Sequence, residues 1–321
     1  MKSFISGFAP IIKEYLEFRI AMGRSDCHER YLRFFDRFCY ERHPEANTLS
    51  REIVLDWISY ESSKDRDALS YKASAIRLFA QYAENGAYIL APSFALKKSS
   101  FTPHIFTVNE LTSLFQAMDD ITPDHGRDPF VCVTAPVLFR LIYTCGLRPG
   151  EGRLLKRKNI NLETGEILIT QTKGHRERIV VMSDDMLEMC RQYDFKRGVI
   201  AGNSEYFFVS GNGMELSLGQ FSSILKRCWR QANPDTPDNF LPRIRPYDLR
   251  HQFASAILHK WLDEDRDMYA MLPYLRAYMG HEEFKHTAYY IHILPEKLLK
   301  SPSVDWEQLD AVIPEVKIWA E

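Results

Sequence analysis

Four stretches near the N-terminus carry apolar side chains at the spacing of an amphipathic helix. Pro10 and Gly23 stand where the first helix would begin and end. Ser25 can cap the second helix and either Ser50 or Thr48 can cap the third, because a hydroxyl oxygen can accept a hydrogen bond from an unpaired amide there. The fourth helix is expected over residues 68–83. The pattern therefore predicts a small all-α domain.

The apolar faces of these helices give the candidate core of that domain. The second helix presents an aromatic stripe, and such a stripe is far more often core than a ligand site. The residues expected to be buried are Tyr31, Phe34, Phe35 and Phe38 in the second helix, Ile53, Val54, Trp57 and Ile58 in the third, and Ile76, Leu78, Phe79 and Tyr82 in the fourth.

Helical spacing fails between Ala91 and Phe106, where prolines, serines and the pair Lys97 and Lys98 occur without an acid. This composition indicates an exposed linker and a domain boundary. The two lysines would either contact a polyanion or belong to an ordinary solvated linker. The predicted division is a helical domain at 1–90, a basic linker at 91–106, a second domain at 107–300 and an amphipathic tail at 301–321.

Strand-like segments join the helices in the second domain. Thr107 and Glu110 form a capping box before a helix, and a further helix is expected over 130–143. β-rich runs flank Gly174 within 166–181, which predicts a hairpin with an exposed tip. The remaining expected elements are a short strand at 206–209, a helix with a basic face at 217–229 and a Pro-rich loop at 233–244. The fold class is therefore mainly α with a small β-sheet.

The formal net charge of −2 argues against a simple polyanion-binding protein, whose affinity would come from clustered Lys and Arg. The distribution of charge weakens that argument. Residues 301–321 carry five acids and one Lys, which leaves +2 on the rest of the chain, and 148–178 holds eight Lys or Arg against four acids. Either the protein has a basic face, or these charges are simply solvated.

Length and composition limit the class of protein. The 321 residues, 45% hydrophobic and 26% charged, fit a globular protein of two domains. Because no apolar run reaches the ~18 residues of a membrane span and the N-terminus lacks the features of a signal peptide, a cytoplasmic protein is expected. The six cysteines are dispersed without a Cys-x-x-Cys pair, so we expect reduced thiols and neither a metal site nor a disulfide framework.

Three short polar motifs lie within the later helical pattern: Arg-Pro-Tyr-Asp-Leu-Arg-His-Gln-Phe-Ala-Ser at 245–255, Met-Gly-His at 279–281 and Thr-Ala-Tyr-Tyr-Ile-His at 287–292. Arg250 offers a planar fork of donors to a phosphate, His281 offers another donor, and Tyr290 offers a phenol able to attack phosphorus. Singly, each residue is better explained as an ion pair, a packed histidine or a core aromatic. Their conjunction favours phosphate chemistry.

Two further motifs lie upstream in a fixed order. Thr-Cys-Gly-Leu-Arg-Pro-Gly-Glu contains Arg148 and Glu151, and Thr-Lys-Gly-His-Arg-Glu-Arg contains Lys173 between the two β-rich runs. Together with the nine-residue step from His281 to Tyr290, these motifs resemble the active-site boxes of the tyrosine recombinase (phage integrase) family. The resemblance is specific across these boxes and extends more loosely over the whole chain.

The resemblance implies a site-specific DNA recombinase that cleaves and rejoins strands through a 3′-phosphotyrosyl intermediate, without a metal, a cofactor or ATP. It also implies a helical core-binding domain that clamps DNA and an α+β catalytic domain. The implied catalytic residues are Arg148, Lys173, Tyr247, Arg250, His281 and Tyr290, supported by Glu151 and His251. The expected DNA contacts are Lys97, Lys98, Arg176, Arg178, Lys226, Arg227, Arg230 and Arg245.

One position departs from the family pattern. Tyr247 stands where the family usually has a His three residues before its second arginine, and a tyrosine with a pKa near ~10 is a poor proton shuttle at neutral pH. His251 could contribute, although we expect it to face the helix packing. Tyr289 is the alternative nucleophile, but the spacing from His281 favours Tyr290.

Other readings stay open at this point. A type IB topoisomerase shares the chemistry, a non-catalytic DNA-binding relative would be signalled by Tyr247, and a metal enzyme would use His281, His286 and His292 without a completing carboxylate. The resemblance further implies nucleoid association, double-stranded DNA with inverted half-sites, a homo-tetramer on paired sites, and accessory DNA-bending or partner recombinase proteins. The tail at 301–321 would dock on a neighbouring subunit or pack on its own domain.

Overall fold

The computed structural model describes residues 4–24, 28–60, 66–83, 86–91, 102–123, 130–170 and 177–293. The chain divides into two compact units, Met1–Thr102 and Pro103–Glu321. In the described residues the fold is mainly helical with one small antiparallel sheet, which confirms the predicted fold class.

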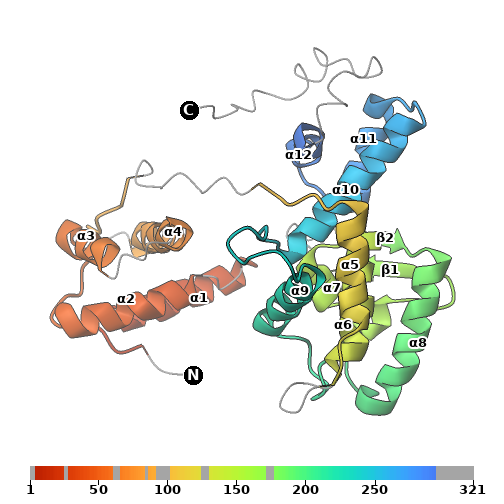
Figure 1. The fold of residues 1–321 in the computed structure, drawn as a ribbon. Helices are drawn as coiled ribbons and strands as arrows, with labels where there is room; N and C mark the ends of the chain where they lie inside the picture. Colours follow the sequence, from red (N-terminus) through yellow and green to blue (C-terminus); the bar gives the residue numbers. More distant parts are fainter. Residues whose placement is uncertain are drawn as a thin grey trace. The chain divides into compact units, whose positions relative to one another are not determined.

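The described part of the first unit contains four helices (Figure 1), which are α1 (Ala9–Ala21), α2 (Glu29–Arg42), α3 (Arg51–Ser59) and α4 (Arg66–Ala83). Gly23 follows α1 with a positive φ of 66°, the conformation that glycine adopts most easily at a helix end. Ser50 caps α3 as predicted, because its side chain accepts a hydrogen bond from the amide of Ile53 at 3.2 Å. The N-cap of α2 is His28. Ser25, the predicted cap, lies outside the described residues.

The core of this unit corrects one part of the predicted aromatic stripe. Phe35 and Phe38 are buried against Trp57, whose ring centroid lies 5.5 Å and 5.3 Å from theirs. Phe34 is instead 51% exposed, with the Arg30 guanidinium 5.8 Å from its ring centroid. The buried stripe of α2 is therefore narrower than the sequence pattern indicates, because one edge of that stripe faces outward.

The second unit is larger. Its elements are α5 (Val108–Asp119), α6 (Val131–Thr144), α7 (Pro149–Arg153), the short 3₁₀-helix η2 (Arg157–Asn159), β1 (Glu166–Ile169), β2 (Arg178–Val181), α8 (Asp184–Ala201), α9 (Leu218–Ala232), α10 (Pro246–Asp263), α11 (Met268–Met279) and α12 (Lys285–Ile293). The capping box of Thr107 and Glu110 forms as predicted. The helices α5, α6, α8 and α9 surround one apolar core, where Phe139 stacks on Phe221 at 4.7 Å between ring centroids.

The two strands pair antiparallel, and the pair of Ile169 with Arg178 stands at the end next to residues 171–176. Those residues, which include Lys173, Gly174 and Arg176, lie outside the described residues. Ile167 and Val180 pair within the sheet and are both buried, so one face of the ribbon covers the core.

The strand predicted at 206–209 is wrong. Only Tyr206 forms an isolated bridge, with Lys156. The backbone groups that follow bond to partners outside any ladder: the Phe207 amide donates to the Leu155 carbonyl at 2.6 Å, and the Val209 amide donates to the Tyr193 hydroxyl at 3.1 Å. Because these groups are buried and already paired, the apolar run forms a core segment without joining the sheet.

Candidate active site

Arg148 lies at the corner between α6 and α7. The chain leaves α6 through Gly146, whose φ is 57°, and a Cβ there would lie 2.4 Å from the Phe253 ring. Arg148 is the N-cap residue of α7, and its amide donates to Glu151 Oε2 at 2.8 Å. Its Nη1 donates to Glu151 Oε1 at 2.7 Å, and its Nη2 donates to the Gly280 carbonyl at 2.6 Å. The turn thus aims the guanidinium toward the end of α11.

Glu151 is the buried carboxylate beneath this arginine. Arg178 donates to both of its oxygens, from Nη1 at 2.9 Å and from Nη2 at 2.6 Å. Burial raises the pKa of Glu151, but the hydrogen bonds and charge of Arg178, followed by those of Arg148, hold the pKa below its ordinary value. Glu151 therefore stays ionised and can hold a cation in place.

Arg250 lies in the first turns of α10 and bonds to two other segments of the chain. Its side chain is 0% exposed. Nη1 donates to the Gly146 carbonyl at 2.7 Å and Nη2 donates to the Met279 carbonyl at 2.6 Å. Nη1 also lies 4.0 Å from Glu151 Oε2, so both candidate phosphate-binding arginines share one carboxylate. The corner after α6, the start of α10 and the end of α11 meet at this guanidinium.

His281 follows Gly280, which ends α11 in the left-handed conformation with φ 64°. Its Nε2 lies 3.1 Å from Arg250 Nη2, and its Nδ1 lies 2.8 Å from the Thr287 hydroxyl. An arginine can only donate, so Nε2 is the acceptor and the ring is neutral. Burial, and then the charges of Arg250 and Arg148, lower the pKa of His281 to about 3, which agrees with this assignment.

Tyr290 on α12 points into the same cluster. It is 2% exposed, whereas its neighbour Tyr289 is 41% exposed. The Tyr290 ring stacks on His281 with centroids 5.9 Å apart, and it lies 5.3 Å from the ring of His251. Burial raises the pKa of Tyr290 to about 12, although the charge of Arg250 acts to lower it. The spacing that favoured Tyr290 over Tyr289 thus selects the tyrosine that contacts the cluster.

The ring of His251 lies between the rings of Tyr247 and Tyr290. Its ring centroid is 5.1 Å from that of Tyr247 and 5.3 Å from that of Tyr290. The side chain is buried, and burial, followed by the charges of Arg250 and Arg245, lowers its pKa to about 4. His251 therefore packs against the site as a neutral ring, in line with the packing position expected from the sequence. A pocket of about 390 Å³ opens beside Tyr247 and Arg148.

The predicted DNA contacts differ in their surroundings. Lys226 and Arg245 are exposed and Arg227 is half-buried. Arg230 forms an ion pair with Asp238 at 3.1 Å and donates to the Thr236 carbonyl, so it also holds the loop after α9. Arg178 lies inside the unit, bonded to Glu151. Those outside the described residues are Lys97, Lys98 and Arg176.

Three partners of these side chains were not predicted from the sequence. They are the Gly280 carbonyl, which accepts from Arg148, the Thr287 hydroxyl beside His281, and Arg178 as a partner of Glu151. A backbone carbonyl leaves no mark in a sequence, and Thr287 was quoted only as part of a motif. Within the described residues, no group of three or more His, Cys, Asp or Glu side chains has a geometry that could hold a metal ion, and no helix is long and apolar enough to cross a membrane.

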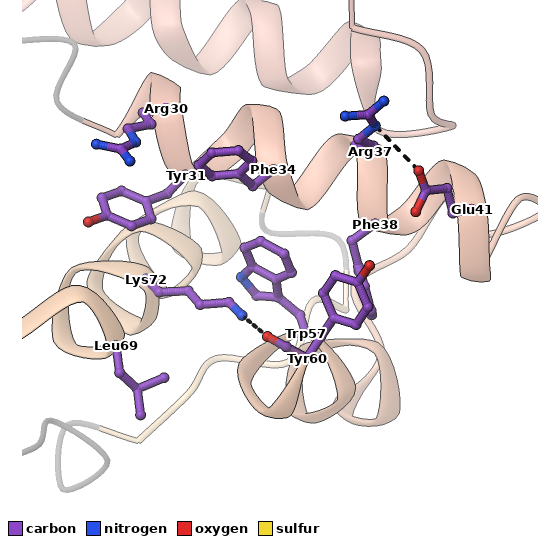
Figure 2. A pocket seen from close by; sticks show the side chains of 10 residues that line it. All are labelled: Arg30, Tyr31, Phe34, Arg37, Phe38, Glu41, Trp57, Tyr60, Leu69 and Lys72. Carbon is purple, nitrogen blue, oxygen red and sulfur yellow. Dashed lines mark hydrogen bonds and ion pairs between the residues drawn. The ribbon is translucent and has the colours of Figure 1, made fainter. Parts of the chain in front are cut away.

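The first unit carries a separate basic and aromatic pocket (Figure 2). Its volume is about 440 Å³, and Tyr31, Phe34, Trp57 and Tyr60 contribute aromatic walls. Lys72 extends across it, with Nζ 3.8 Å from the centroid of the Trp57 ring and 2.6 Å from the Tyr60 carbonyl, to which it donates. Arg30 and Arg37 stand on α2 at the rim, and Arg37 pairs with Glu41 at 3.3 Å. Cations beside aromatic faces suit a nucleic-acid surface.

Acid should destabilise the second unit, because the folded state keeps His251 neutral. An unfolded histidine binds a proton below about pH 6.5, whereas folded His251 does so only near pH 4. The unfolded state therefore binds more protons as the pH falls, and stability is lost from about pH 6.5 downward. We expect His251 alone to contribute a loss on the order of 2 kcal/mol between pH 6.5 and pH 5.

Urea denaturation at both pH values measures this loss. In the control variant His251→Gln, which does not titrate, the free energy of unfolding should change less between the two pH values. An equal change in the variant and the wild-type protein would contradict the assignment to His251.

Residues 104–297 match the family model of the phage integrase family. The protein y4rE of Sinorhizobium fredii, named as an integrase/recombinase, is 26% identical over 306 residues, which cover 91% of this chain and 93% of y4rE. The tyrosine recombinase XerC of Oceanobacillus iheyensis is 26% identical over 263 residues, which cover 79% of this chain and 79% of XerC. These similarities extend across most of each protein.

Solved recombinases share the fold. The Tn1549 transposon integrase, in complex with circular intermediate DNA, aligns with a TM-score of 0.61 at 14% identity, covering 87% of this chain and 94% of that chain. The site-specific recombinase XerH, bound to its difH substrate, aligns with a TM-score of 0.59 at 18% identity, covering 83% and 76%. Because the family model matches more than half of the sequence, the chain belongs to the phage integrase family of tyrosine recombinases, and its function is site-specific DNA recombination.

Proposed function

We propose that this recombinase cleaves and rejoins DNA through Tyr290, with the scissile phosphate held by Arg148 and Arg250, and by His281 once its Nε2 carries the ring proton. The observation that carries the proposal is their convergence: the guanidinium groups of both arginines approach Glu151, His281 contacts Arg250, and Tyr290 stacks on His281. Two guanidinium groups can neutralise the charge that builds on the non-bridging oxygens of a phosphate under attack.

The reaction begins when the Tyr290 oxygen attacks phosphorus and the bond to the 5′ oxygen breaks. The phenol loses its proton, the departing 5′ hydroxyl gains one, and a 3′-phosphotyrosyl ester conserves the bond energy. Attack on that ester by another 5′ hydroxyl reverses the step and rejoins a strand. We assign protonation of the departing oxygen to Lys173 on the resemblance to the family.

The Arg250 side chain has one donor in reserve for this chemistry, because its buried Nε has no hydrogen-bond partner among the described residues. Both of its terminal nitrogens donate to backbone carbonyls in the structure, and one also contacts His281. A phosphate in the site would compete for these donors, because it adds the attraction of opposite charges to the hydrogen bonds that an arginine already makes to neutral carbonyls.

Covalent trapping tests this function. The protein is incubated with duplexes taken from the DNA that flanks its gene, in buffer that contains EDTA, and the products are separated under denaturing conditions. We expect a protein–DNA adduct that protease digestion reduces to a peptide on a DNA 3′ end. DNA binding without any adduct favours a non-catalytic relative. Site-independent relaxation of supercoiled DNA favours a topoisomerase.

The finer features of assembly rest on the family and on the sequence. We propose inverted half-sites as the DNA partner, a tetramer on paired sites and docking of the tail at 301–321 on a neighbouring subunit. Accessory DNA-bending or partner recombinase proteins and nucleoid association belong to the same proposal. Sedimentation of the protein with one and with two half-sites tests the assembly, and a persistent monomer on paired sites would contradict it.

A further inference from the structure

Arg178 is the first residue of β2, and its side chain turns into the protein although it was predicted to contact DNA. The side chain is 9% exposed. It donates to three acceptors on two other elements, which are the two oxygens of Glu151 and the Tyr278 carbonyl at the end of α11. On the basis of these contacts we infer that Arg178 is a positioning residue, which acts through Glu151 to hold Arg148 where it can bind the scissile phosphate. The inference rests on the proposed function.

The carboxylate of Glu151 is fully used by the two arginines. Oε1 accepts from Arg148 Nη1 at 2.7 Å and from Arg178 Nη1 at 2.9 Å. Oε2 accepts from the Arg148 amide at 2.8 Å and from Arg178 Nη2 at 2.6 Å. An ionised carboxylate has about four acceptor sites, so Arg178 fills half of them. Without Arg178 the buried carboxylate would lose two charge-assisted bonds, and the anchor of Arg148 would loosen.

Gly280 provides the space for this arrangement. A Cβ at Gly280 would lie 3.1 Å from Arg178 Nη1 and 3.2 Å from Arg178 Cδ, and the φ of 64° already favours glycine. The Gly280 carbonyl accepts from Arg148 Nη2 at 2.6 Å. Gly280 therefore leaves room for the Arg178 side chain because it has no Cβ, and its carbonyl holds the Arg148 guanidinium. The Gly-His motif positions an arginine as well as presenting His281.

Arg178 also links the strand β2 to α7 and α11. β2 follows directly after residues 171–177, a segment that contains Lys173, the proposed general acid. Arg178 joins the first residue of that strand to α7 through Glu151 and to α11 through the Tyr278 carbonyl. The strand that follows the lysine segment and the residues that bind the phosphate are therefore linked by one side chain.

Cleavage kinetics of Arg178→Met test the inference. The assay is single-turnover formation of the covalent complex on a suicide duplex, in which the short 5′-hydroxyl fragment diffuses away after cleavage. We expect Arg178→Met to bind this duplex like the wild-type protein and to form the complex about 100-fold more slowly at pH 7, because small displacements of catalytic groups have effects of that order.

The pH dependence of the cleavage rate distinguishes a positioning role of Arg178 from a role in the stability of the fold alone. In Arg178→Met, burial of Glu151 is no longer opposed by Arg178, so its carboxylate takes up a proton as the pH falls. The variant should therefore slow further as the pH is lowered, relative to the wild-type protein. Adding Glu151→Gln to Arg178→Met should remove this dependence, because the titrating group is gone.

Arg197 supplies the matched control. It is also a buried arginine, and it donates to the Tyr206 and Ser204 carbonyls and lies 3.7 Å from Asp194, away from the cluster. Arg197→Met should form the covalent complex within a few-fold of the wild-type rate. If Arg178→Met and Arg197→Met slow by the same factor and with the same pH profile, Arg178 supports only the fold and the inference is wrong.

A second variant covers the case in which Arg178→Met does not fold. Arg178→Lys keeps the charge but cannot make the forked pair of bonds, so we expect a rate about tenfold below that of the wild-type protein and an unchanged pH profile. Wild-type rates for the Lys variant would also overturn the inference. A wild-type protein that forms no adduct would instead contradict the proposed function.

Discussion

Replacing Tyr290 with phenylalanine is expected to abolish the covalent protein–DNA complex and to leave DNA binding unchanged. The substitution removes only the oxygen that attacks phosphorus, so no ester can form. The ring of Tyr290 is buried and packs against His281 and His251, and phenylalanine keeps that packing. The variant should therefore fold, and a mobility shift on the same duplex should show wild-type affinity.

Tyr289→Phe is the matched control for this experiment. Tyr289 is the adjacent residue on α12, but it is 41% exposed and its ring lies 6.1 Å from that of Tyr290. We expect Tyr289→Phe to form the adduct at close to the wild-type rate. Adduct formation by Tyr290→Phe together with its loss in Tyr289→Phe would show that the nucleophile has been wrongly assigned.

Replacing Arg148 with alanine is expected to slow cleavage by about 10²–10³-fold, the usual effect of removing one donor that stabilises charge in a transition state. Arg148 is the better of the two arginines for this test because its side chain is partly exposed at the corner between α6 and α7. Arg250 is fully buried and bonded to the Gly146 and Met279 carbonyls, so Arg250→Ala would also leave buried carbonyls without a donor.

The control for Arg148→Ala comes from α7, the helix that follows Arg148. Arg153 lies on α7 and donates to the Leu216 carbonyl at 2.6 Å, so its replacement removes a guanidinium that is not bonded to the cluster. Arg153→Ala should cleave at a rate close to that of the wild-type protein. Covalent-complex formation over time on the suicide duplex measures both variants. Equal rates for Arg148→Ala and the wild-type protein would exclude Arg148 from phosphate binding.

The sequence by itself determined the features that depend on near neighbours in the chain. A serine three residues before an unpaired amide is a local signal, and Ser50 caps α3 as that signal predicts. Each polar motif is also a run of near neighbours, and the resemblance of these motifs to the boxes of the family predicted Arg148, Arg250, His281 and Tyr290 as site residues, which lie in one cluster in the structure.

Tertiary structure decided the features that depend on contacts between distant segments. The run at 206–209 has the composition of a strand, but its buried amides pair with Leu155 and Tyr193. Phe34 belongs to the predicted stripe but faces outward. A basic residue beside a hairpin tip is expected to reach solvent, yet Arg178 is buried because its charge is neutralised by Glu151, 27 residues earlier in the chain. A side chain's environment is set by the groups that fold against it, and a pattern of nearby residues does not contain them.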